Sequence, residues 1–257
     1  MPINSVCRLI EYRTTDDNLI TEENISTLNL HGLSMGEQVI CDLTDALSNN
    51  TVNSLFIVSL TSKLTTLHLG NNQIGIFGAQ YVARLLRNKS TVTTLDLQSN
   101  GIEDSEVQYL AMILSKNTTL LTLNLRDNYF GTKATEYLVT ALIHNRTLTS
   151  LDLRGNNLGV QGAKVLAEAL PHMTTLTALN IAKTKIENEG AHAIADILLS
   201  NTSLKVLDLT YNNIAESEGQ HSIAVLRNHT QLVSLKLAHN KISDDTLRTI
   251  DELLKNN

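Results

Sequence analysis

A regular internal repeat organises most of this 257-residue chain and constrains its fold more than any other feature. Its units begin with an apolar residue at a constant interval of 28 positions: Leu64, Val92, Leu120, Leu148, Leu176, Leu204 and Leu232. Each unit has Leu three positions after its start, Leu or Ile five after, and an apolar residue ten after. Eight positions after the start, six of seven units carry Asn, and the other has Thr184: Asn72, Asn100, Asn128, Asn156, Asn212 and Asn240. A fixed period of this length is typical of stacked structural repeats.

Two local periods inside each unit predict its secondary structure. The Leu-x-Leu pattern alternates with period two, as in a strand with one buried face. The second half of the unit has helical spacing, and Ala79, Val82, Ala83 and Leu86 fall on one helix face. Each unit is therefore predicted to be a strand, a turn, a helix and a return loop. Because one unit cannot bury its apolar face alone, the units are expected to stack with parallel strands.

The recurring Asn has a predicted role in the turn. Its amide carries donors and an acceptor, so it can satisfy backbone groups where the strand ends. Thr184 offers fewer hydrogen-bonding groups, and its turn is expected to be looser.

The pattern LxxLxLxxNxI that begins at Leu64 resembles the signature of the leucine-rich-repeat family. The segment from Leu148 to Leu170 is similar to the consensus of the ribonuclease-inhibitor subclass, whose repeats contain a full helix. The resemblance covers residues 64–257 closely and residues 25–63 loosely. It implies an α/β fold, a right-handed solenoid shaped like a horseshoe, with parallel strands on the concave face and helices on the convex face.

The chain is interpreted as one solenoid domain. Residues 1–24 are expected to form an N-terminal cap over the first strand edge. Residues 25–63 are interpreted as irregular repeats, because the unit starting at Ile25 lacks its Asn and residues 52–63 leave no room for a helix. Residues 64–257 are interpreted as seven regular repeats, the last helix having the polar outer face of a C-terminal cap.

Charge and composition disfavour several function classes. Lys and Arg total 20 against 26 Asp and Glu, a formal charge of −6, which disfavours nucleic acid and anionic membranes as partners. No apolar stretch is long enough to span a membrane, and the N-terminus lacks the pattern of a secretory signal. Two cysteines suit a reducing cytoplasm. We expect a cytoplasmic monomer.

Side chains beside the strand leucines are predicted to face the concave surface in rows, one residue from each unit. The candidate partner-binding residues in these rows are His68, Asp96, Gln98, Asn124, Arg126, Asp127, Asp152, Arg154, Lys183, Asp208, Tyr211, Lys236 and His239. Arg126 and Arg154 share a row, and adjacent guanidinium groups can clamp a carboxylate or a phosphate. The alternative is that they pair with nearby aspartates: Asp96, Asp127 and Asp152.

Lys183, Tyr211 and His239 form a second candidate patch with a partly apolar anchor. The alternative is that they are separate surface residues. On the convex side, Tyr81, Tyr109 and Tyr137 recur in register. They are expected to fill grooves between helices, and the alternative is an aromatic docking strip.

Enzyme motifs are absent from the sequence. It has no Gly-rich nucleotide loop, Gly-x-Ser-x-Gly elbow or His-Glu-x-x-His helix, so we expect neither catalysis nor a cofactor. Asp96, Asp152 and Asp208 share a row on alternate units, about 10 Å apart by the strand spacing, which is too far to share a proton. The eight histidines are scattered along the chain, and no metal site is expected. Asn-x-Ser/Thr sequons recur in the return loops and are attributed to repeat copying.

These observations favour a non-enzymatic module that binds a protein partner through its concave face. The resemblance to the ribonuclease-inhibitor subclass implies recognition inside the cell. The composition, rich in Asn, Thr and Ile, also resembles leucine-rich-repeat effectors that intracellular bacteria such as Legionella deliver into the host cytosol. One alternative is a GTPase-activating protein of the Ran-activator type, in which Arg126 or Arg154 approaches a γ-phosphate. Another is the targeting arm of a larger ubiquitin ligase or effector.

Overall fold

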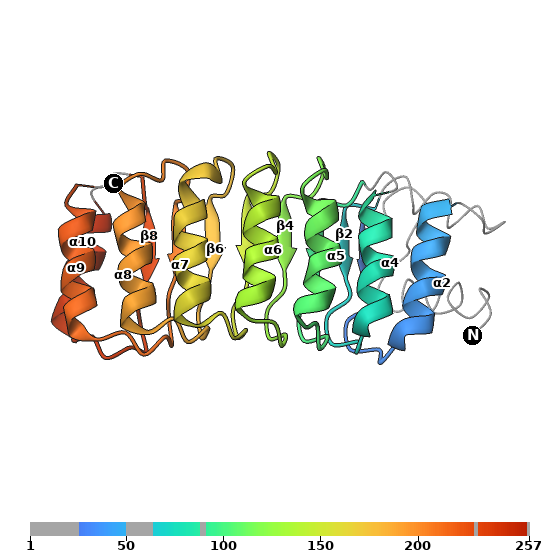
Figure 1. Ribbon diagram of the computed structural model, residues 1–257, viewed down its shortest axis with the longest axis horizontal. Helices are drawn as coiled ribbons and strands as arrows, with labels where there is room; N and C mark the ends of the chain where they lie inside the picture. Colours follow the sequence, from blue (N-terminus) through green and yellow to red (C-terminus); the bar gives the residue numbers. More distant parts are fainter. Residues whose placement is uncertain (1–25, 50–63, 88–90, 229–230, 256–257) are drawn as a thin grey trace, which may run out of the picture.

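The computed structural model describes residues 26–49, 64–87, 91–228 and 231–255, in which strands alternate with helices (Figure 1). The strands are β1 (Thr27–Asn29), β2 (Thr66–His68), β3 (Thr94–Asp96), β4 (Thr122–Asn124), β5 (Ser150–Asp152), β6 (Ala178–Asn180), β7 (Val206–Asp208) and β8 (Ser234–Lys236). The helices are α2 (Gly36–Asn49), α4 (Gly75–Arg87), α5 (Asp104–Leu114), α6 (Thr132–Leu142), α7 (Gly159–Ala169), the 3-10 turn η1 (Leu170–His172), α8 (Glu187–Leu198), α9 (Glu216–Leu226) and α10 (Asp244–Leu254). The cap predicted at residues 1–24 and the segment at residues 52–63 lie outside these ranges.

The strands of the described residues form one parallel sheet of eight strands in sequence order. From β2 onward, each residue pairs with its equivalent in the next repeat, so Leu67 lies beside Leu95 and Leu95 beside Leu123. β1 pairs directly with β2, with Leu28 beside Leu67. The helices stand side by side in one layer and the strands form the other (Figure 1). This arrangement confirms the predicted α/β solenoid.

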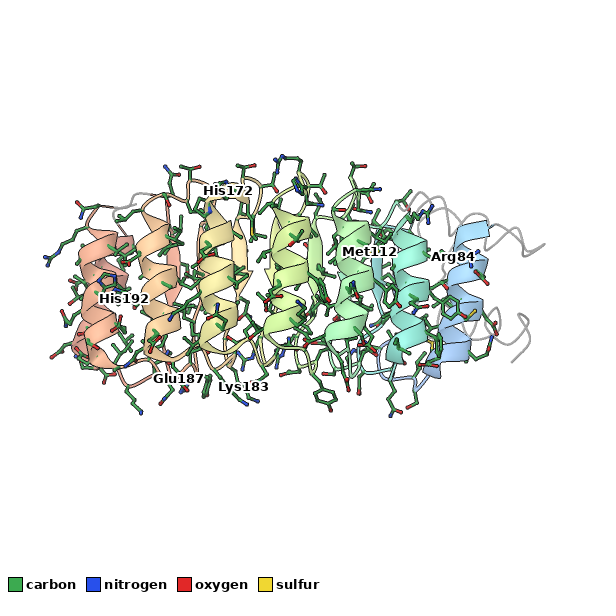
Figure 2. All side chains as sticks on the ribbon, in the orientation of Figure 1. Arg84, Met112, His172, Lys183, Glu187 and His192 are labelled. Atoms are coloured by element: carbon green, nitrogen blue, oxygen red, sulfur yellow. The ribbon has the colours of Figure 1, made fainter. Side chains whose placement is uncertain are left out.

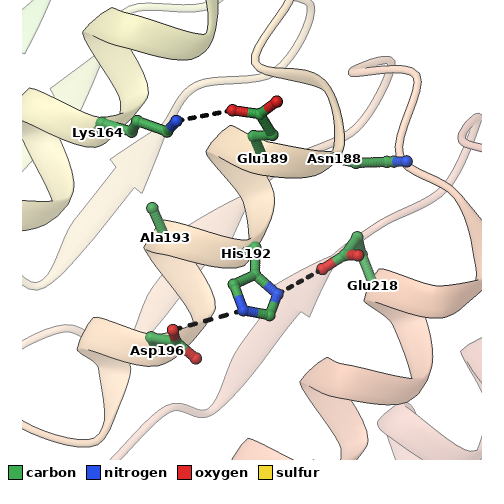
Figure 3. Close-up of a pocket in the computed structure, with 7 residues that line it drawn as sticks. All are labelled: Lys164, Asn188, Glu189, His192, Ala193, Asp196 and Glu218. Atoms are coloured by element: carbon green, nitrogen blue, oxygen red, sulfur yellow. Dashed lines mark hydrogen bonds and ion pairs between the residues drawn. The ribbon is translucent and has the colours of Figure 1, made fainter.

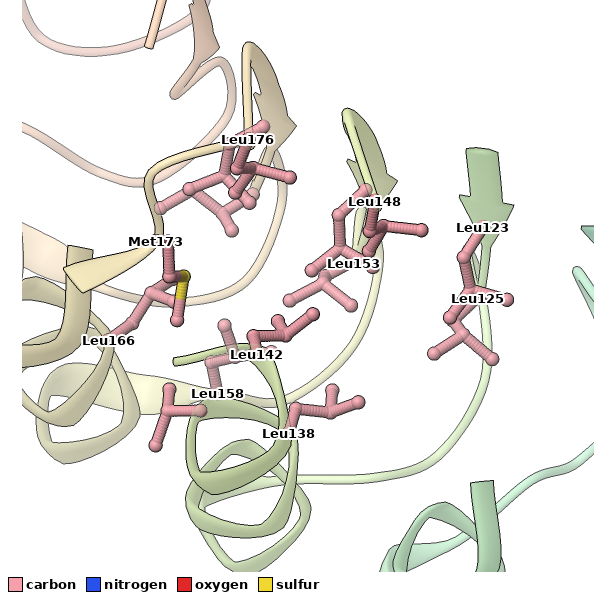
Figure 4. Close-up of a cluster of buried hydrophobic side chains, with 14 of the residues drawn as sticks. Leu123, Leu125, Leu138, Leu142, Leu148, Leu153, Leu158, Leu166, Met173 and Leu176 are labelled. Atoms are coloured by element: carbon pink, nitrogen blue, oxygen red, sulfur yellow. The ribbon is translucent and has the colours of Figure 1, made fainter. Parts of the chain in front are cut away.

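The core lies between the two layers and consists of the apolar positions of the repeat (Figure 4). Leu123 and Leu125 from the β4 region lie with Leu138 and Leu142 of α6 in this buried cluster. Phe130 is the largest of the fully buried side chains among the described residues. Burying one such side chain contributes roughly 1.5–3 kcal/mol. Because the same positions recur in every repeat, the core is continuous along the solenoid.

The recurring Asn connects neighbouring repeats. Nδ2 of Asn128 donates to the carbonyl of Leu125 at 2.8 Å and to that of Leu97, in the preceding repeat, at 3.1 Å. Its Oδ1 accepts from the N–H groups of Asn100 at 2.9 Å and Ile102 at 3.1 Å. The same carbonyl bonds, with at least one accepted N–H, occur at Asn72, Asn100, Asn156, Asn212 and Asn240. We call this series the asparagine ladder.

Thr184 replaces one rung of the asparagine ladder. Its Oγ1 donates to the carbonyl of Ile181 at 2.6 Å. The turn persists, and Lys183, Lys185 and Glu187 adopt positive φ angles of 54°, 60° and 55°. Non-glycine residues rarely occupy this region. The turn therefore keeps its course with fewer side-chain bonds than the other turns make.

A second series of asparagines supports the return loops. Nδ2 of Asn145 donates to the carbonyl of Leu114 at 2.7 Å, and its Oδ1 accepts from the N–H of Leu148 at 2.7 Å. Asn117 and Asn201 make equivalent bonds. All three belong to Asn-x-Ser/Thr sequons and are buried. In these three sequons the asparagine amides are therefore engaged with the backbone.

Glu216 at the start of α9 holds the start of α10. The hydroxyl of Thr246 donates to its carboxylate, as do the N–H of Ser243 at 2.7 Å and the amide of Gln220 at 3.2 Å. These bonds, that of Thr246 first, lower the pKa of Glu216 from its ordinary value of 4.5 to about 2. The charged carboxylate is thus part of the contact between the last two helices of the described residues.

Acid is expected to weaken the contact between α9 and α10. A carboxyl group whose folded-state pKa is depressed stabilises the fold above its unfolded pKa. This stabilisation should therefore be lost as the pH falls from 4.5 toward about 2. Protection of the α10 amides, measured by hydrogen exchange corrected for intrinsic rates, should fall over this window in the wild type. In the Glu216→Gln variant, protection of the α10 amides should already be low at neutral pH, and it should change less with pH than in the wild type. Glu187→Gln is the exposed control, and parallel curves for the wild type and Glu216→Gln would contradict this prediction.

Candidate protein-binding surface

The strand face, which is the concave side of the predicted solenoid, carries a row of polar side chains. These are His68, Asp96, Asn124, Asp152, Asn180, Asp208 and Lys236. Nδ2 of Asn124 donates to Oδ1 of Asp96 at 2.9 Å, and Nδ2 of Asn180 donates to Oδ2 of Asp152 at 3.0 Å. Nδ1 of His68 lies 3.4 Å from Oδ2 of Asp96. Much of the row is therefore paired within itself.

The aspartates of this row also bind the backbone two residues ahead. Oδ1 of Asp152 accepts from the N–H of Arg154 at 2.8 Å, and Oδ1 of Asp208 accepts from the N–H of Thr210 at 3.0 Å. Burial raises the pKa of Asp152, while the N–H of Arg154 and the amide of Asn180 act in the opposite direction. These carboxylates fix the backbone at the ends of the strands. They therefore have a structural role and are less available to bind a partner.

The two arginines of the next row have different surroundings. Nε of Arg126 donates to Oδ2 of Asp127 at 2.7 Å, which is one of the pairings considered from the sequence. Gly155 makes room for this pair, because a Cβ there would overlap Oδ1 of Asp127. Nε of Arg154 is buried without a hydrogen-bond partner in the described part of the chain. The charge of Arg126 is thus balanced by its neighbour, and Arg154 retains an unused donor.

Arg154 joins the two patches that the sequence suggested separately. Its guanidinium carbon lies 5.9 Å from the centre of the Tyr211 ring. The ring of Tyr211 stacks on that of His239, with centres 4.1 Å apart and planes at 12°. Between the repeats of Arg154 and Tyr211 the row position is Ala182, whose single methyl group leaves space for the long side chain. We call Arg154, Tyr211 and His239 the Arg–Tyr–His cluster.

Of the other partner-binding residues predicted from the sequence, some lie near the Arg–Tyr–His cluster and others lie farther along the sheet. Lys183 belongs to the repeat between Arg154 and Tyr211 and is exposed. Figure 2 shows Lys183 at one long edge of the molecule and His172 at the opposite edge. His68 lies on β2 and Lys236 on β8, so they are far apart along the sheet; Lys236 Nζ is 4.0 Å from Asp208. Oε1 of Gln98 accepts from Asn124 at 3.5 Å.

The tyrosines of the helix face mainly pack between helices. Tyr81 and Tyr137 lie half-buried against the core. Nζ of Lys133 is 5.5 Å from the centre of the Tyr137 ring. Tyr109 is more open, and Met112 on the same helix is 62% exposed (Figure 2). The groove-filling interpretation thus fits Tyr81 and Tyr137 better than Tyr109.

One group of titratable side chains was missed in the sequence. Ligand atoms of His192, Asp196 and His221 lie within 4.8 Å of one another on the helix face, so the expectation that the histidines are scattered is wrong here. The sequence does contain a signal for this group. His192 and Asp196 have the i,i+4 spacing that places them on one helix face, and His221 follows His192 after 29 positions, one more than the 28-residue period. The matching glycines, Gly190 and Gly219, have the same interval, so the two histidines occupy equivalent helix positions.

Comparison with known proteins agrees with this architecture. The family model described as Leucine Rich repeat matches residues 62–83, 88–111, 116–137, 144–167, 172–195 and 200–216, just over half of the chain. Among solved structures, "Leiomodin-1 Actin-Binding Site 2 (ABS2)" is similar with a TM-score of 0.51 and 19% identity, over 60% of this chain and 88% of that one. No curated protein sequence matches. Within the described residues, every helix is too short or too polar to cross a membrane. This chain belongs to the leucine-rich-repeat family.

Proposed function

We propose that this chain is a non-catalytic module that binds a protein partner through its strand face, with the Arg–Tyr–His cluster at the centre of the interface. The observation that carries the proposal is the contact of Arg154 with a preformed Tyr211–His239 stack. Tyr and Arg are the residue types in which binding energy is most often concentrated.

The cluster is ordered before any partner arrives. The stack of Tyr211 on His239 limits the rotamers of both rings, so little side-chain entropy remains to be lost on binding. Tyr211 is nevertheless 48% exposed, which leaves apolar ring surface for a partner. The strand row beneath is held by its own hydrogen bonds, so the platform is rigid.

The charges around the cluster favour an acidic partner segment. Arg154 as a whole is half-buried, so the exposed part of its guanidinium can donate to a partner carboxylate, although its Nε is buried. Lys183 and Lys185 are exposed in the adjacent repeat. Glu187 is exposed beside them (Figure 2), so the two lysines add donors to an edge of mixed charge.

The repeat subclass, the cellular role and the GTPase-activating alternative each depend on different observations. The constant repeat period and helices of 11 or more residues support the ribonuclease-inhibitor subclass. An intracellular role, and that of a bacterial effector acting on host proteins, rests on this subclass and on the Asn-, Thr- and Ile-rich composition. A GTPase-activating role is less favoured, because Asp127 already holds the guanidinium of Arg126 and that of Arg154 lies against the Tyr211 ring.

The test is comparative capture from eukaryotic cytosol followed by calorimetry with each captured protein. The double variant Arg154→Ala/Tyr211→Ala should bind the partner at least about 100-fold more weakly than the wild type, since two central hot-spot residues are removed. Tyr109→Ala removes an exposed aromatic from the helix face and should bind as the wild type does. Equal capture by the wild type and the double variant, with loss in Tyr109→Ala, would place the interface on the helices and contradict the proposal.

A further inference from the structure

A groove on the helix face contains His192 between the carboxylates of Asp196 and Glu218, which the protein-binding proposal does not use (Figure 3). His221 of α9 lies next to this group. Nε2 of His192 lies 3.6 Å from Oδ2 of Asp196, and Nε2 of His221 lies 2.6 Å from Oδ1 of the same residue. The two imidazole rings stack with centres 4.1 Å apart. Three side chains from two helices thus place one potential ligand atom each within 4.8 Å of one another.

The hydrogen bonding of His192 is incomplete when its ring is neutral. Its Nδ1 lies 2.9 Å from Oε2 of Glu218, and its Nε2 also faces a carboxylate, that of Asp196. A neutral imidazole carries only one N–H, so one nitrogen would present its lone pair to an oxygen. With the proton on Nδ1, donated to Glu218, a cation bound at Nε2 would satisfy both contacts. A carboxylate behind a metal-bound histidine is the usual outer partner that fixes its tautomer.

The donor set selects a class of metal. Two imidazole nitrogens and one carboxylate suit Zn²⁺ and similar divalent transition metals, whereas Mg²⁺ and Ca²⁺ prefer oxygen ligands. Zinc binds such atoms at about 2.0–2.2 Å, so neighbouring ligand atoms around it lie about 3.4 Å apart. The 3.6 Å contact already has this spacing. Around a bound ion the 2.6 Å contact would have to open and the stacked rings would have to turn toward the ion, by rotation of the side chains of His221 and Asp196, which are 28% and 55% exposed.

Local charge and access also favour a cation. The groove has a volume of about 390 Å³, and its lining includes the carboxylates of Glu189, Asp196 and Glu218. Lys164 lies there too, but its Nζ is paired with Glu189 at 2.7 Å. The side chains of His192 and Asp196 are 51% and 55% exposed, so an ion can enter from solvent.

The arrangement is not a by-product of the repeat. His192 lies two positions after Gly190 in α8. The equivalent positions in the four preceding helices, α4 to α7, carry other residues: Gln80, Gln108, Glu136 and Lys164. Two histidines face each other only between α8 and α9 among the described helices, and the extra residue before Gly219 sets their register.

We propose that His192, Asp196 and His221 form a binding site for one divalent transition-metal ion of the zinc type, with Glu218 positioning His192. The bound ion would link α8 to α9. Its remaining coordination positions would face solvent, where water or a side chain of another protein can occupy them. This site is on the opposite layer from the Arg–Tyr–His cluster, so it is independent of the proposed partner interface.

The test is titration of the tag-free protein with ZnCl₂, followed by calorimetry and thermal unfolding. We expect one equivalent of Zn²⁺ to bind with a micromolar Kd and Mg²⁺ not to compete. At free zinc about 100-fold above Kd, Tm should rise by about 5 °C, because the ion binds only the folded state. His192→Asn and His221→Asn should each weaken binding at least about 100-fold, and Glu218→Gln about 10-fold.

His172→Asn is the matched control, since His172 is an exposed histidine at the edge of the molecule (Figure 2). It should bind zinc as the wild type does. Circular dichroism and the metal-free Tm of each variant show whether its fold is retained, and Asp196→Asn tests the site without changing a histidine. The proposal is overturned if the wild type binds no zinc with defined stoichiometry, or if the folded His192→Asn and His221→Asn variants retain wild-type affinity.

Discussion

Replacing Asn128 by Ala is expected to lower the free energy of unfolding by about 3 kcal/mol. The carbonyls of Leu97 and Leu125 would keep one partner each, because Asn100 and Asn156 also donate to them. The N–H groups of Asn100 and Ile102 would lose the acceptor that Asn128 provides. A buried donor without a partner costs about 1–3 kcal/mol, so two donors account for the expected loss.

Urea unfolding followed by circular dichroism measures this effect, and hydrogen exchange at Asn100 and Ile102 locates it. Asn157→Ala is the matched control, since Asn157 is exposed and outside the asparagine ladder. It should change stability by less than about 0.5 kcal/mol. If Asn128→Ala is as stable as Asn157→Ala, the ladder does not stabilise the repeats as described.

Replacing Phe130 by Ala is expected to cost about 3–5 kcal/mol, because a fully buried aromatic side chain is removed and a cavity remains. For a chain of this size, each kcal/mol corresponds to about 2–4 °C in Tm, so Tm should fall by roughly 10 °C. Differential scanning calorimetry checks the prediction. A loss of about 1 kcal/mol or less would show that the core around Phe130 collapses to fill the space.

Phe130→Leu provides the control that the repeat itself suggests. The next repeat has Leu158 at the equivalent position, also fully buried. Leu is smaller than Phe but fills more of the site than Ala does, so this variant should lose clearly less stability than Phe130→Ala, about 1–2 kcal/mol. A large loss in both variants would indicate that the site requires an aromatic ring, contrary to the equivalence of the two repeats.

The architecture could be predicted from the sequence because the repeat period determines which residues become neighbours in the folded chain. When units stack in register, residues one period apart become neighbours, so the pairing of Leu67 with Leu95 follows from the period alone. The burial of Asn72, Asn100, Asn128, Asn156 and Asn212 also follows, since each occupies the same turn and has a further repeat stacked beyond it. The repeat did not indicate what the sequon asparagines do: the amides of Asn117 and Asn145 support the return loops.

The candidate sites were less predictable. That Arg126 and Arg154 share a row follows from their spacing, but which partner each side chain takes depends on rotamers. Arg126 turns to Asp127, and Arg154 extends across Ala182 to Tyr211, two repeats away. No fixed spacing encodes these choices, because they depend on the space left by neighbouring side chains.

The sequence by itself therefore determined the repeat, the two layers, the core positions and the polar character of the strand face. The tertiary structure alone decided which of those polar residues meet. It also brought His192 and His221 together across two helices, where the register is one position longer than the repeat period. The physical reason is that backbone stacking obeys the period of the chain, whereas side-chain contacts depend on local register and packing space.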